Sequence, residues 1–336
     1  MRSRPVRARR ALALTATTVV TALVLAACGS NEEPPEASPE PQETVEGSTL
    51  TAQSPLTGEP VEGAAPKHPV MVVKIDNSAA SSPQVGLGDA DLVAEELVEG
   101  GSTRLAAFFY SSLPAEVGPV RSSRATDIGI VKPLGGVLIA SGGAPVTLGR
   151  LQAEGIRTVT EGGPGFFRSS QRRSPYNLMM NLRDLAKTLK PNAPDPYFTW
   201  GTAEDFPGGR PATRIEATYS GGRTSVWTHG RRGYTAENGY AAQGDGFTAQ
   251  TLVILRVQVG DAGYRDPAGN PVPESRFEGR GQAFVFHGGE VVRGTWTKRG
   301  FDGAVTLQTQ AGELTLPPGK VYLGLVPANG GDVQFN

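Results

Sequence analysis

The chain has 336 residues, enough for two domains of ordinary size, and its formal net charge at pH 7 is −1. Five of its arginines precede residue 11, so processing of the N-terminus would leave a more acidic chain without a basic block. This charge distribution argues against a nucleic-acid partner. The single cysteine excludes an intrachain disulfide and a cysteine metal cluster.

The N-terminal segment, residues 1–27, has the organisation of a secretory signal peptide. Its arginines precede an apolar run from Ala11 to Ala27 that is shorter than the about 20 residues of a membrane-spanning helix. The run ends in Leu25-Ala26-Ala27-Cys28-Gly29, which resembles the lipobox of bacterial lipoproteins. The resemblance implies that Cys28 is acylated and becomes the new N-terminus after cleavage. An uncleaved anchor helix is the alternative.

Residues 28–66 are predicted to be a tether between the lipid anchor and the folded part. The stretch from Asn31 to Pro41 is rich in proline and glutamate and has little apolar surface to bury. Such a segment cannot repay the entropy of ordering and stays extended. We therefore expect the folded part to begin near residue 67.

Alternating strands and helices are predicted for residues 67–205, which indicates an N-terminal α/β domain. In chain order we expect a buried strand at 69–76, a hairpin of strands 92–99 and 103–111 that turns at Gly100-Gly101, a helix near 125–131, a strand at 136–141, a helix at 144–154 and an amphipathic helix at 177–189. A helix over 89–98 competes with the first strand of the hairpin. Pro191 and two further prolines follow the last helix and end it.

The character of the chain changes near Arg210, where helical periodicity is lost and glycine-rich turns separate short strands. The predicted strands are 215–219, 225–228, 251–259, 282–287, 291–297, 304–309 and 321–326. Residues 210–336 are therefore predicted to form a mostly β domain, as a sandwich or a partly open barrel. The chain as a whole is predicted to be α+β.

Several strings in order along the chain resemble the YerB-type family of bacterial lipoproteins, a two-part domain family of unknown function. They include Pro69 to Asn77, Pro83 to Leu87, Asp91 to Gly101, Val117 to Arg124, Ser174 to Leu178, Gly294 to Lys298 and Leu316 to Gly319. The chain departs from the family pattern at Ala94, where an aromatic residue is usual, and at Ser82, where arginine is usual. The resemblance covers about residues 67–330 and implies location and architecture, but no reaction.

The most informative candidate site is the string Arg121-Ser-Ser-Arg124. Two guanidinium groups three residues apart, beside hydroxyls at a predicted helix start, suit a phosphate or a carboxylate. The alternative is an internal network in which both arginines pair with Glu95, Glu96 or Glu99 and hold the loop in place. Both arrangements can coexist, because a paired arginine keeps spare donors.

Acidic and amide side chains near this string are further candidates. Asp76 and Asn77 end the first strand, where ligands bind in α/β sheets, and a turn or a helix cap is the alternative. Glu95, Glu96 and Glu99 form a compact acidic group. Adjacent strand residues point to opposite faces, so Glu96 and its neighbour Glu95 are poor candidates for paired catalytic carboxylates.

Asp127 and the pair Tyr176-Asn177 complete the candidate set. Asp127 follows the arginine string, and Tyr176-Asn177 lies in a second polar group with Arg168 and Arg172. A solvated basic loop is the default interpretation of this second group, and a lining of the same cleft as Arg121 is the alternative.

Other kinds of site lack support in the sequence. The histidines at positions 68, 229 and 287 do not have metal-ligand spacing. Ser141 lies outside any Gly-x-Ser-x-Gly pattern, and neither a phosphate-binding loop nor a dinucleotide fingerprint is present. We therefore predict neither a metal site nor a cofactor.

Together these features predict a lipid-anchored protein on the outer face of the cytoplasmic membrane. Its expected function is binding of an anionic cell-envelope ligand or a partner protein, with Arg121 and Arg124 in the binding cleft. A cell-envelope hydrolase or transferase is one alternative, in which the arginines clamp the substrate and Asp76, Glu96 or Asp127 moves the proton. An envelope scaffold that recruits another protein through a sheet edge is a further alternative.

Overall fold

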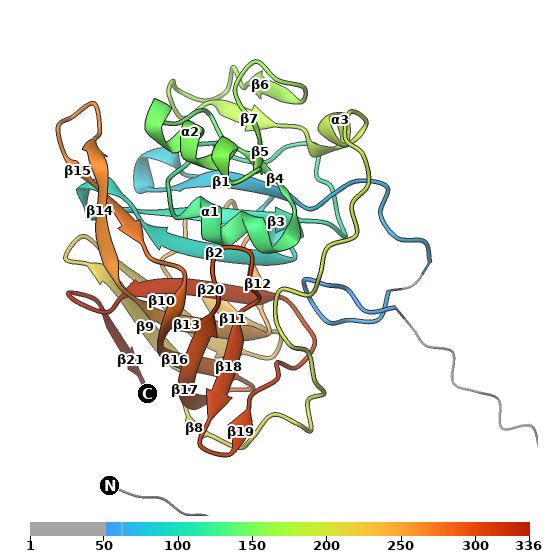
Figure 1. The fold of residues 1–336 in the computed structure, drawn as a ribbon, viewed down its shortest axis with the longest axis vertical. Helices are drawn as coiled ribbons and strands as arrows, with labels where there is room; N and C mark the ends of the chain where they lie inside the picture. The colour runs from blue at the N-terminus through green and yellow to red at the C-terminus, as the bar shows by residue number, and fades with distance from the viewer. Residues whose placement is uncertain (1–51, 62) are drawn as a thin grey trace, which may run out of the picture. The chain divides into compact units, whose positions relative to one another are not determined.

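A long mixed sheet with strands from both halves of the chain dominates the computed structural model, which describes residues 52–61 and 63–336. In spatial order its strands are β19 (Gly312–Glu313), β18 (Thr306–Thr309), β17 (Glu290–Lys298), β16 (Gly279–His287), β13 (Thr251–Val257), β20 (Val321–Pro327), β2 (Leu92–Leu97), β3 (Thr103–Phe109), β1 (Met71–Asn77), β4 (Val137–Ile139) and β5 (Arg157–Val159). Strand β8 (Arg210–Pro211) pairs with β17 beside this path. Figure 1 shows the blue-to-green strands of the first half continuing into the yellow-to-red strands of the second half.

The two halves join where β2 and β20 pair in parallel. The register places Glu95 of β2 opposite Gly324 of β20. A Cβ atom at Gly324 would lie 2.8 Å from the Tyr219 hydroxyl and 2.7 Å from Ile254 Cδ1, so the missing side chain makes room for Tyr219. Segments 67–205 and 210–336, predicted as separate domains, therefore share one sheet.

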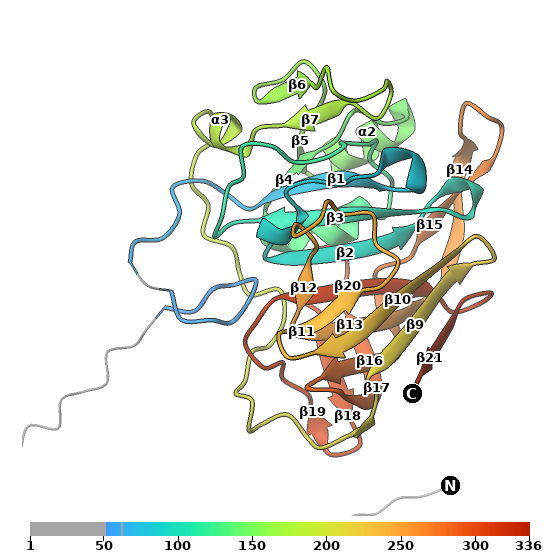
Figure 2. The same ribbon diagram turned by 180° about the vertical axis from the view of Figure 1, so that it is seen from behind.

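A second sheet packs on one face of the long sheet, as Figure 2 shows from behind. Its strand order is β12 (Thr248–Ala249), β11 (Gly233–Ala236), β10 (Arg223–Gly230), β9 (Arg214–Ser220) and β21 (Asp332–Phe335). Strands β9 and β10 alternate buried and half-exposed residues, with Ile215, Trp227 and others facing inward. This period of two is the pattern of strands with one face against the core.

Each face of the long sheet has its own hydrophobic core. Met71, Val73 and Ile75 of β1 belong to the core under the second sheet, whereas Val70 and Val72 belong to the opposite core. Helices α1 (Asp127–Val131) and α2 (Pro145–Ala153) contribute to that opposite core, and α3 (Leu182–Ala186) contributes to the first one. Because both faces are covered, the central strands are apolar almost throughout.

Most predicted elements of the first half are present. The hairpin of β2 and β3 is antiparallel and turns at Gly100-Gly101, whose φ angles of 68° and 72° favour glycine. The strands at β1 and β4 and the helices at α1 and α2 lie within a few residues of their predicted bounds. The structure therefore decides for the hairpin and against the competing helix over 89–98.

The predicted amphipathic helix over 177–189 is wrong. Leu178–Met180 forms strand β7, which pairs with β6 (Phe166–Arg168), and helix α3 has only five residues. Backbone N–H and C=O groups of Met180 also bond with Val117 at 2.9 Å in both directions. The apolar period matched a helix, but these distant pairing partners hold the segment extended.

The folded part begins before the predicted boundary at residue 67. Leu56 is fully buried in the core on the side of α1, and the Trp200 indole N–H donates to Pro55 O at 3.3 Å. The signal peptide over residues 1–27 and the lipidated Cys28 lie outside the described residues. None of the helices that are described is long and apolar enough to span a membrane.

Both halves of the chain have more residues in strands than in α-helices. The mostly β prediction for residues 210–336 is confirmed, because strands β8 to β21 occupy that segment, including the hairpin of β14 (Val259–Arg265) and β15 (Pro271–Ser275). Residues 67–205 have α1, α2 and α3, of which only α2 exceeds five residues. This half is accordingly less helical than an α/β domain would require.

Candidate functional site

Polar side chains form two separate clusters close to the turn of the β2–β3 hairpin, one on each face of the long sheet. Glu95 and Glu96 are adjacent in β2, and their side chains point to opposite faces, as expected from strand geometry. The helix-side network contains Lys74, Glu96, Glu99, Arg104, Arg124 and Asp127. The inter-sheet cavity on the other face contains Glu95.

Lys74 is the centre of the helix-side network. Its Nζ lies 2.6 Å from Glu96 Oε1 and 2.7 Å from Asp127 Oδ1, and all three side chains are fully buried. Burial alone would lower the pKa of Lys74, but the adjacent carboxylates of Asp127 and Glu96 raise it above the ordinary value. Burial raises the pKa of Glu96, against the attraction of Lys74. These groups hold α1 against β1 and β2.

Arg124 is committed to the same network. Its Nε donates to Glu99 Oε2 at 2.8 Å, a terminal amino group pairs with Glu99 Oε1, and the other donates to Ser123 O at 2.6 Å. Arg104 binds the same Glu99 Oε1 at 2.9 Å. Although burial opposes ionisation, the bonds from Arg124 and the charges of both arginines lower the pKa of Glu99 to about 2.

Arg121 has other partners than Arg124. It pairs with Asp76, with 2.7 Å between Nε and Oδ2, and its guanidinium lies 5.4 Å from the Tyr176 ring centroid. The side chain is 27% exposed, against 8% for Arg124. The structure thus brings Arg121, Asp76 and Tyr176 together, but it does not combine the two arginines into one clamp.

The two asparagines among the predicted residues lie in different parts of the structure. Asn177 lies beside Arg168, near the surface, where its backbone carbonyl accepts from Ser169 N at 2.9 Å. Asn77 faces the inter-sheet cavity instead, because it lies one residue beyond Asp76 in β1 and so points to the other face.

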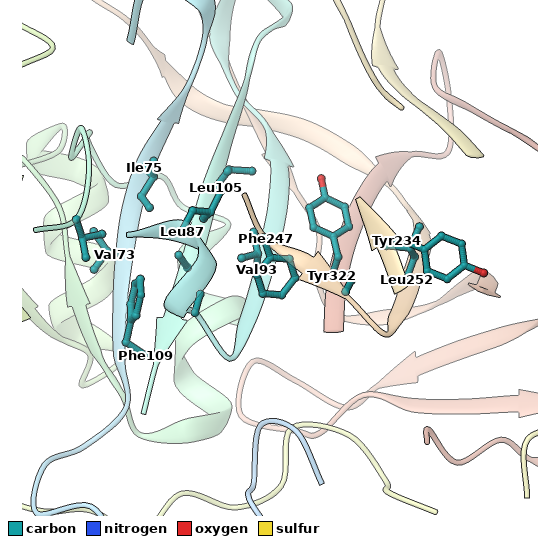
Figure 3. Close-up of a cluster of buried hydrophobic side chains, with 14 of the residues drawn as sticks. Val73, Ile75, Leu87, Val93, Leu105, Phe109, Tyr234, Phe247, Leu252 and Tyr322 are labelled. Carbon is teal, nitrogen blue, oxygen red and sulfur yellow. The ribbon is translucent and has the colours of Figure 1, made fainter. Parts of the chain in front are cut away.

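The inter-sheet cavity has a volume of about 230 Å³ and lies between the long sheet and the second sheet. Its wall combines residues of both halves of the chain: Asn77, Gln84, Leu87, Val93, Glu95, Leu105, Arg223, Ser225, Trp227, Thr235, Ala236, Ala241, Phe247 and Tyr322, with the glycine-rich loop 237–247 at its rim. Figure 3 shows the apolar members of this wall that are labelled, among them Val93, Phe247 and Tyr322.

Glu95 is the buried carboxylate of this cavity, and five donors surround it. Oε1 accepts from Asn77 Nδ2 at 2.9 Å, from Thr103 Oγ1 at 2.6 Å and from Arg223 Nε at 3.4 Å. Oε2 accepts from Ser225 Oγ at 2.7 Å and from the Tyr322 hydroxyl. These donors stabilise the charge, as a fully buried carboxylate requires.

The rim of the cavity connects the two halves through loop 237–247. Backbone bonds of 2.7 Å join Gln84 N to Tyr240 O and Ala242 N to Gln84 O. The Asp245 carboxylate accepts from Gly86 N at 2.5 Å and from Gly88 N at 3.3 Å. Hydrogen bonds therefore connect loop 84–88 of the first half with loop 237–247 of the second half at the rim of the cavity.

Sequence reasoning missed most of this cavity. Glu95 was considered only together with Glu96 and Glu99. The sequence did not indicate four other residues of the cavity wall as candidates, namely Arg223, Ser225, Trp227 and Tyr322. One signal was present: residues 223, 225 and 227 alternate in a strand and so share one face. The position of that face opposite β2 depends on pairing across the whole chain.

No group of three or more potential metal ligands occurs in residues 52–61 and 63–336. The cavity offers one carboxylate, and its oxygens are already occupied by protein donors. The cavity therefore has mostly apolar walls and one polar end around Glu95.

Fold and cavity define a mostly β protein in two parts with an internal space between its sheets. The chain belongs to the protein family of unknown function DUF3048, whose N-terminal domain matches residues 56–195 and whose C-terminal domain matches residues 212–323. The family resemblance noted in the sequence is thereby confirmed. The interval between the two matches contains the predicted junction at 205–210.

Comparison with the YerB protein of Bacillus subtilis supports the same family membership. The putative lipoprotein YerB of Bacillus subtilis (strain 168) is 22% identical over 290 residues, which cover 82% of this chain and 86% of YerB. The crystal structure of the YerB protein from Bacillus subtilis aligns with a TM-score of 0.70 at 21% identity, covering 84% of this chain and 99% of that chain. At this identity the structural match shows the fold.

Proposed function

We propose that the protein is a lipid-anchored binding protein on the outer face of the cytoplasmic membrane, and that its ligand occupies the inter-sheet cavity. This proposal depends on the observation that residues of both halves line one cavity. The cavity contains a buried carboxylate that is surrounded by hydrogen-bond donors. The lipobox-like string at Cys28 and the similarity to a putative lipoprotein support the anchor. Neither half encloses this space alone, so the two-part architecture itself builds the site.

The cavity fits a binding role better than the arginine string does. All three guanidinium nitrogens of Arg124 have protein partners, so only Arg121 keeps donors for a further group. The carboxylates that a hydrolase or transferase would need belong to side chains that are at most 9% exposed and ion-paired, those of Asp76, Glu96 and Asp127. The contacts among the described residues thus favour ligand binding over catalysis.

Native mass spectrometry of the full-length protein, purified in detergent from membranes, tests the binding role. Ala242 lines the cavity, so Ala242→Phe should fill part of it, whereas Ala311→Phe makes the same change at an exposed turn between β18 and β19. We expect a small co-purifying molecule with the native protein and with Ala311→Phe, and its loss from Ala242→Phe. Equal recovery from both variants, or no bound molecule from any of them, would contradict the proposal.

A further inference from the structure

Arg223 offers unused donors in the inter-sheet cavity. Only its Nε bonds to Glu95, at 3.4 Å, and its two terminal amino groups have no hydrogen-bond partner among the described residues. The side chain is nevertheless 90% buried, and its guanidinium lies 5.2 Å from the Tyr240 ring centroid. A guanidinium in this position presents a planar pair of donors to the cavity.

Trp227 supplies another donor. Its indole Nε1 is buried without a hydrogen-bond partner, whereas Trp200 Nε1 donates to Pro55 O and Trp296 Nε1 donates to Arg256 O. An unpaired buried donor costs about 1–3 kcal/mol, so such groups are rare in folded proteins. Trp227 lines the cavity, and an acceptor on a ligand there would satisfy it.

The Glu95 and Asn77 acceptors at the polar end are already occupied. Both oxygens of Glu95 accept protein donors, and Asn77 Oδ1 accepts from Gln84 Nε2 at 3.2 Å. The free groups of Arg223 and Trp227 are donors only. A ligand that matches this end therefore brings acceptor atoms, and the positive charge of Arg223 selects a negatively charged one.

The rest of the wall is apolar and limits the size of the ligand. The Trp227 and Tyr322 ring centroids are 4.3 Å apart, and Phe247, Val93 and Leu105 continue this surface. Since an apolar cavity of roughly 150 Å³ holds benzene, a volume of about 230 Å³ accommodates roughly ten non-hydrogen atoms.

Building on the proposed function, we infer that the ligand is a compact apolar molecule with one carboxylate, which is bound by Arg223 and the Trp227 indole N–H. The planar carboxylate accepts the paired amino groups of Arg223, and its hydrocarbon or aromatic body packs on Trp227 and Phe247. Glu95 does not bind the ligand, and its bonds to Arg223 and Ser225 position β10 against β2.

Phenylacetate and phenylacetamide are suitable probes, because both have ten non-hydrogen atoms and nearly the same shape but differ in charge. Calorimetric titration of the full-length protein in detergent at pH 7 measures both affinities. Fluorine NMR of protein labelled with 5-fluorotryptophan reports which of the three tryptophans meets the probe. We expect phenylacetate to bind at least tenfold more tightly than the amide and to shift the Trp227 signal alone.

Two variants locate the charge selection. Arg223→Gln should remove the preference for phenylacetate over the amide while the Trp227 signal still shifts, and Arg223→Lys should keep part of the preference. Trp227→Phe preserves an aromatic wall without the N–H and should weaken both probes by a similar factor. Thermal unfolding of each variant shows whether it keeps the fold, and the ratio of the two affinities stays informative in a destabilised protein.

The possible outcomes test the carboxylate assignment separately from the proposed binding role. Equal or tighter binding of the amide, or a preference that survives in Arg223→Gln, would refute the carboxylate assignment and leave the cavity as a binding site. Failure of both probes to bind or to shift Trp227 would also refute this ligand class. The binding role itself depends on the co-purification result with Ala242→Phe, which is independent of these probes.

Discussion

Glu95 and Glu96 follow one another in β2, yet their carboxylates lie on opposite faces of the long sheet and have no partner in common. Glu96 pairs with Lys74 at 2.6 Å beneath α1, and Glu95 accepts from Ser225 at 2.7 Å in the inter-sheet cavity. One short strand thus supplies both the ionic network that holds the helices and the polar end of the proposed binding site.

Arg124 should contribute more to stability than Arg121. Replacement by methionine keeps much of the aliphatic stem in both cases, but Arg124→Met leaves the Glu99 carboxylate with Arg104 alone. We expect the free energy of unfolding to fall by about 3 kcal/mol for Arg124→Met and by about 1 kcal/mol or less for the more exposed Arg121→Met. Urea denaturation measures both values, and equal losses would show that Arg124 is no more structural than Arg121.

Acid should weaken the fold partly through Glu99. Its pKa is about 2 in the folded protein, against 4.5 for the ordinary side chain, so the folded form binds a proton less readily than the unfolded chain. This lowered pKa stabilises the protein above pH 4.5 by about 3 kcal/mol, and the contribution is lost as the pH falls from 4.5 towards 2. In Glu99→Gln this contribution is absent at every pH.

Unfolding free energies of native protein and Glu99→Gln should therefore converge as the pH is lowered from 5 to 2. Glu237 provides a control, since hydrogen bonding from Thr228 lowers its pKa as well, but at an exposed surface position. The difference between native protein and Glu237→Gln should change much less over the same interval. A constant difference for Glu99→Gln would contradict the lowered pKa.

Tyr322→Phe tests the ring of donors around Glu95. The substitution removes the hydroxyl that donates to Glu95 Oε2 and leaves the aromatic ring in place. Loss of a bond to a buried carboxylate should lower the free energy of unfolding by about 2 kcal/mol. Tyr110→Phe is the control, because its hydroxyl has no protein hydrogen-bond partner among the described residues and its loss should cost less than about 0.5 kcal/mol. Similar costs for both would mean that Glu95 does not depend on Tyr322.

Cys28→Ser tests the proposed anchor. The native protein should fractionate with membranes and carry the added mass of acyl chains on its N-terminal peptide, because two or three chains bind a bilayer firmly. The serine variant should lack that mass and leave the membrane fraction. If both proteins fractionate and mature alike, Cys28 is not the site of lipidation.

The sequence by itself determined the local pattern of this protein. Apolar runs and alternation predicted β1 to β4 and most strands of the second half, Gly100-Gly101 predicted the hairpin turn, and the period of two already separated Glu95 from Glu96. These features are readable because they depend on neighbours within a few residues. The same local period failed at 177–189, where pairing of Met180 with Val117 overrides it.

Only the tertiary structure decided what the polar residues do. Ser225 and Tyr322 bond to Glu95 from 130 and 227 positions away along the chain, and Arg124 reaches Glu99 across 25 positions. Each strand carries its side-chain period in its own sequence, but its neighbour in the sheet is selected by packing of the whole chain. The inter-sheet cavity exists only once β2, β10 and β20 are brought together, so no local pattern could have revealed it.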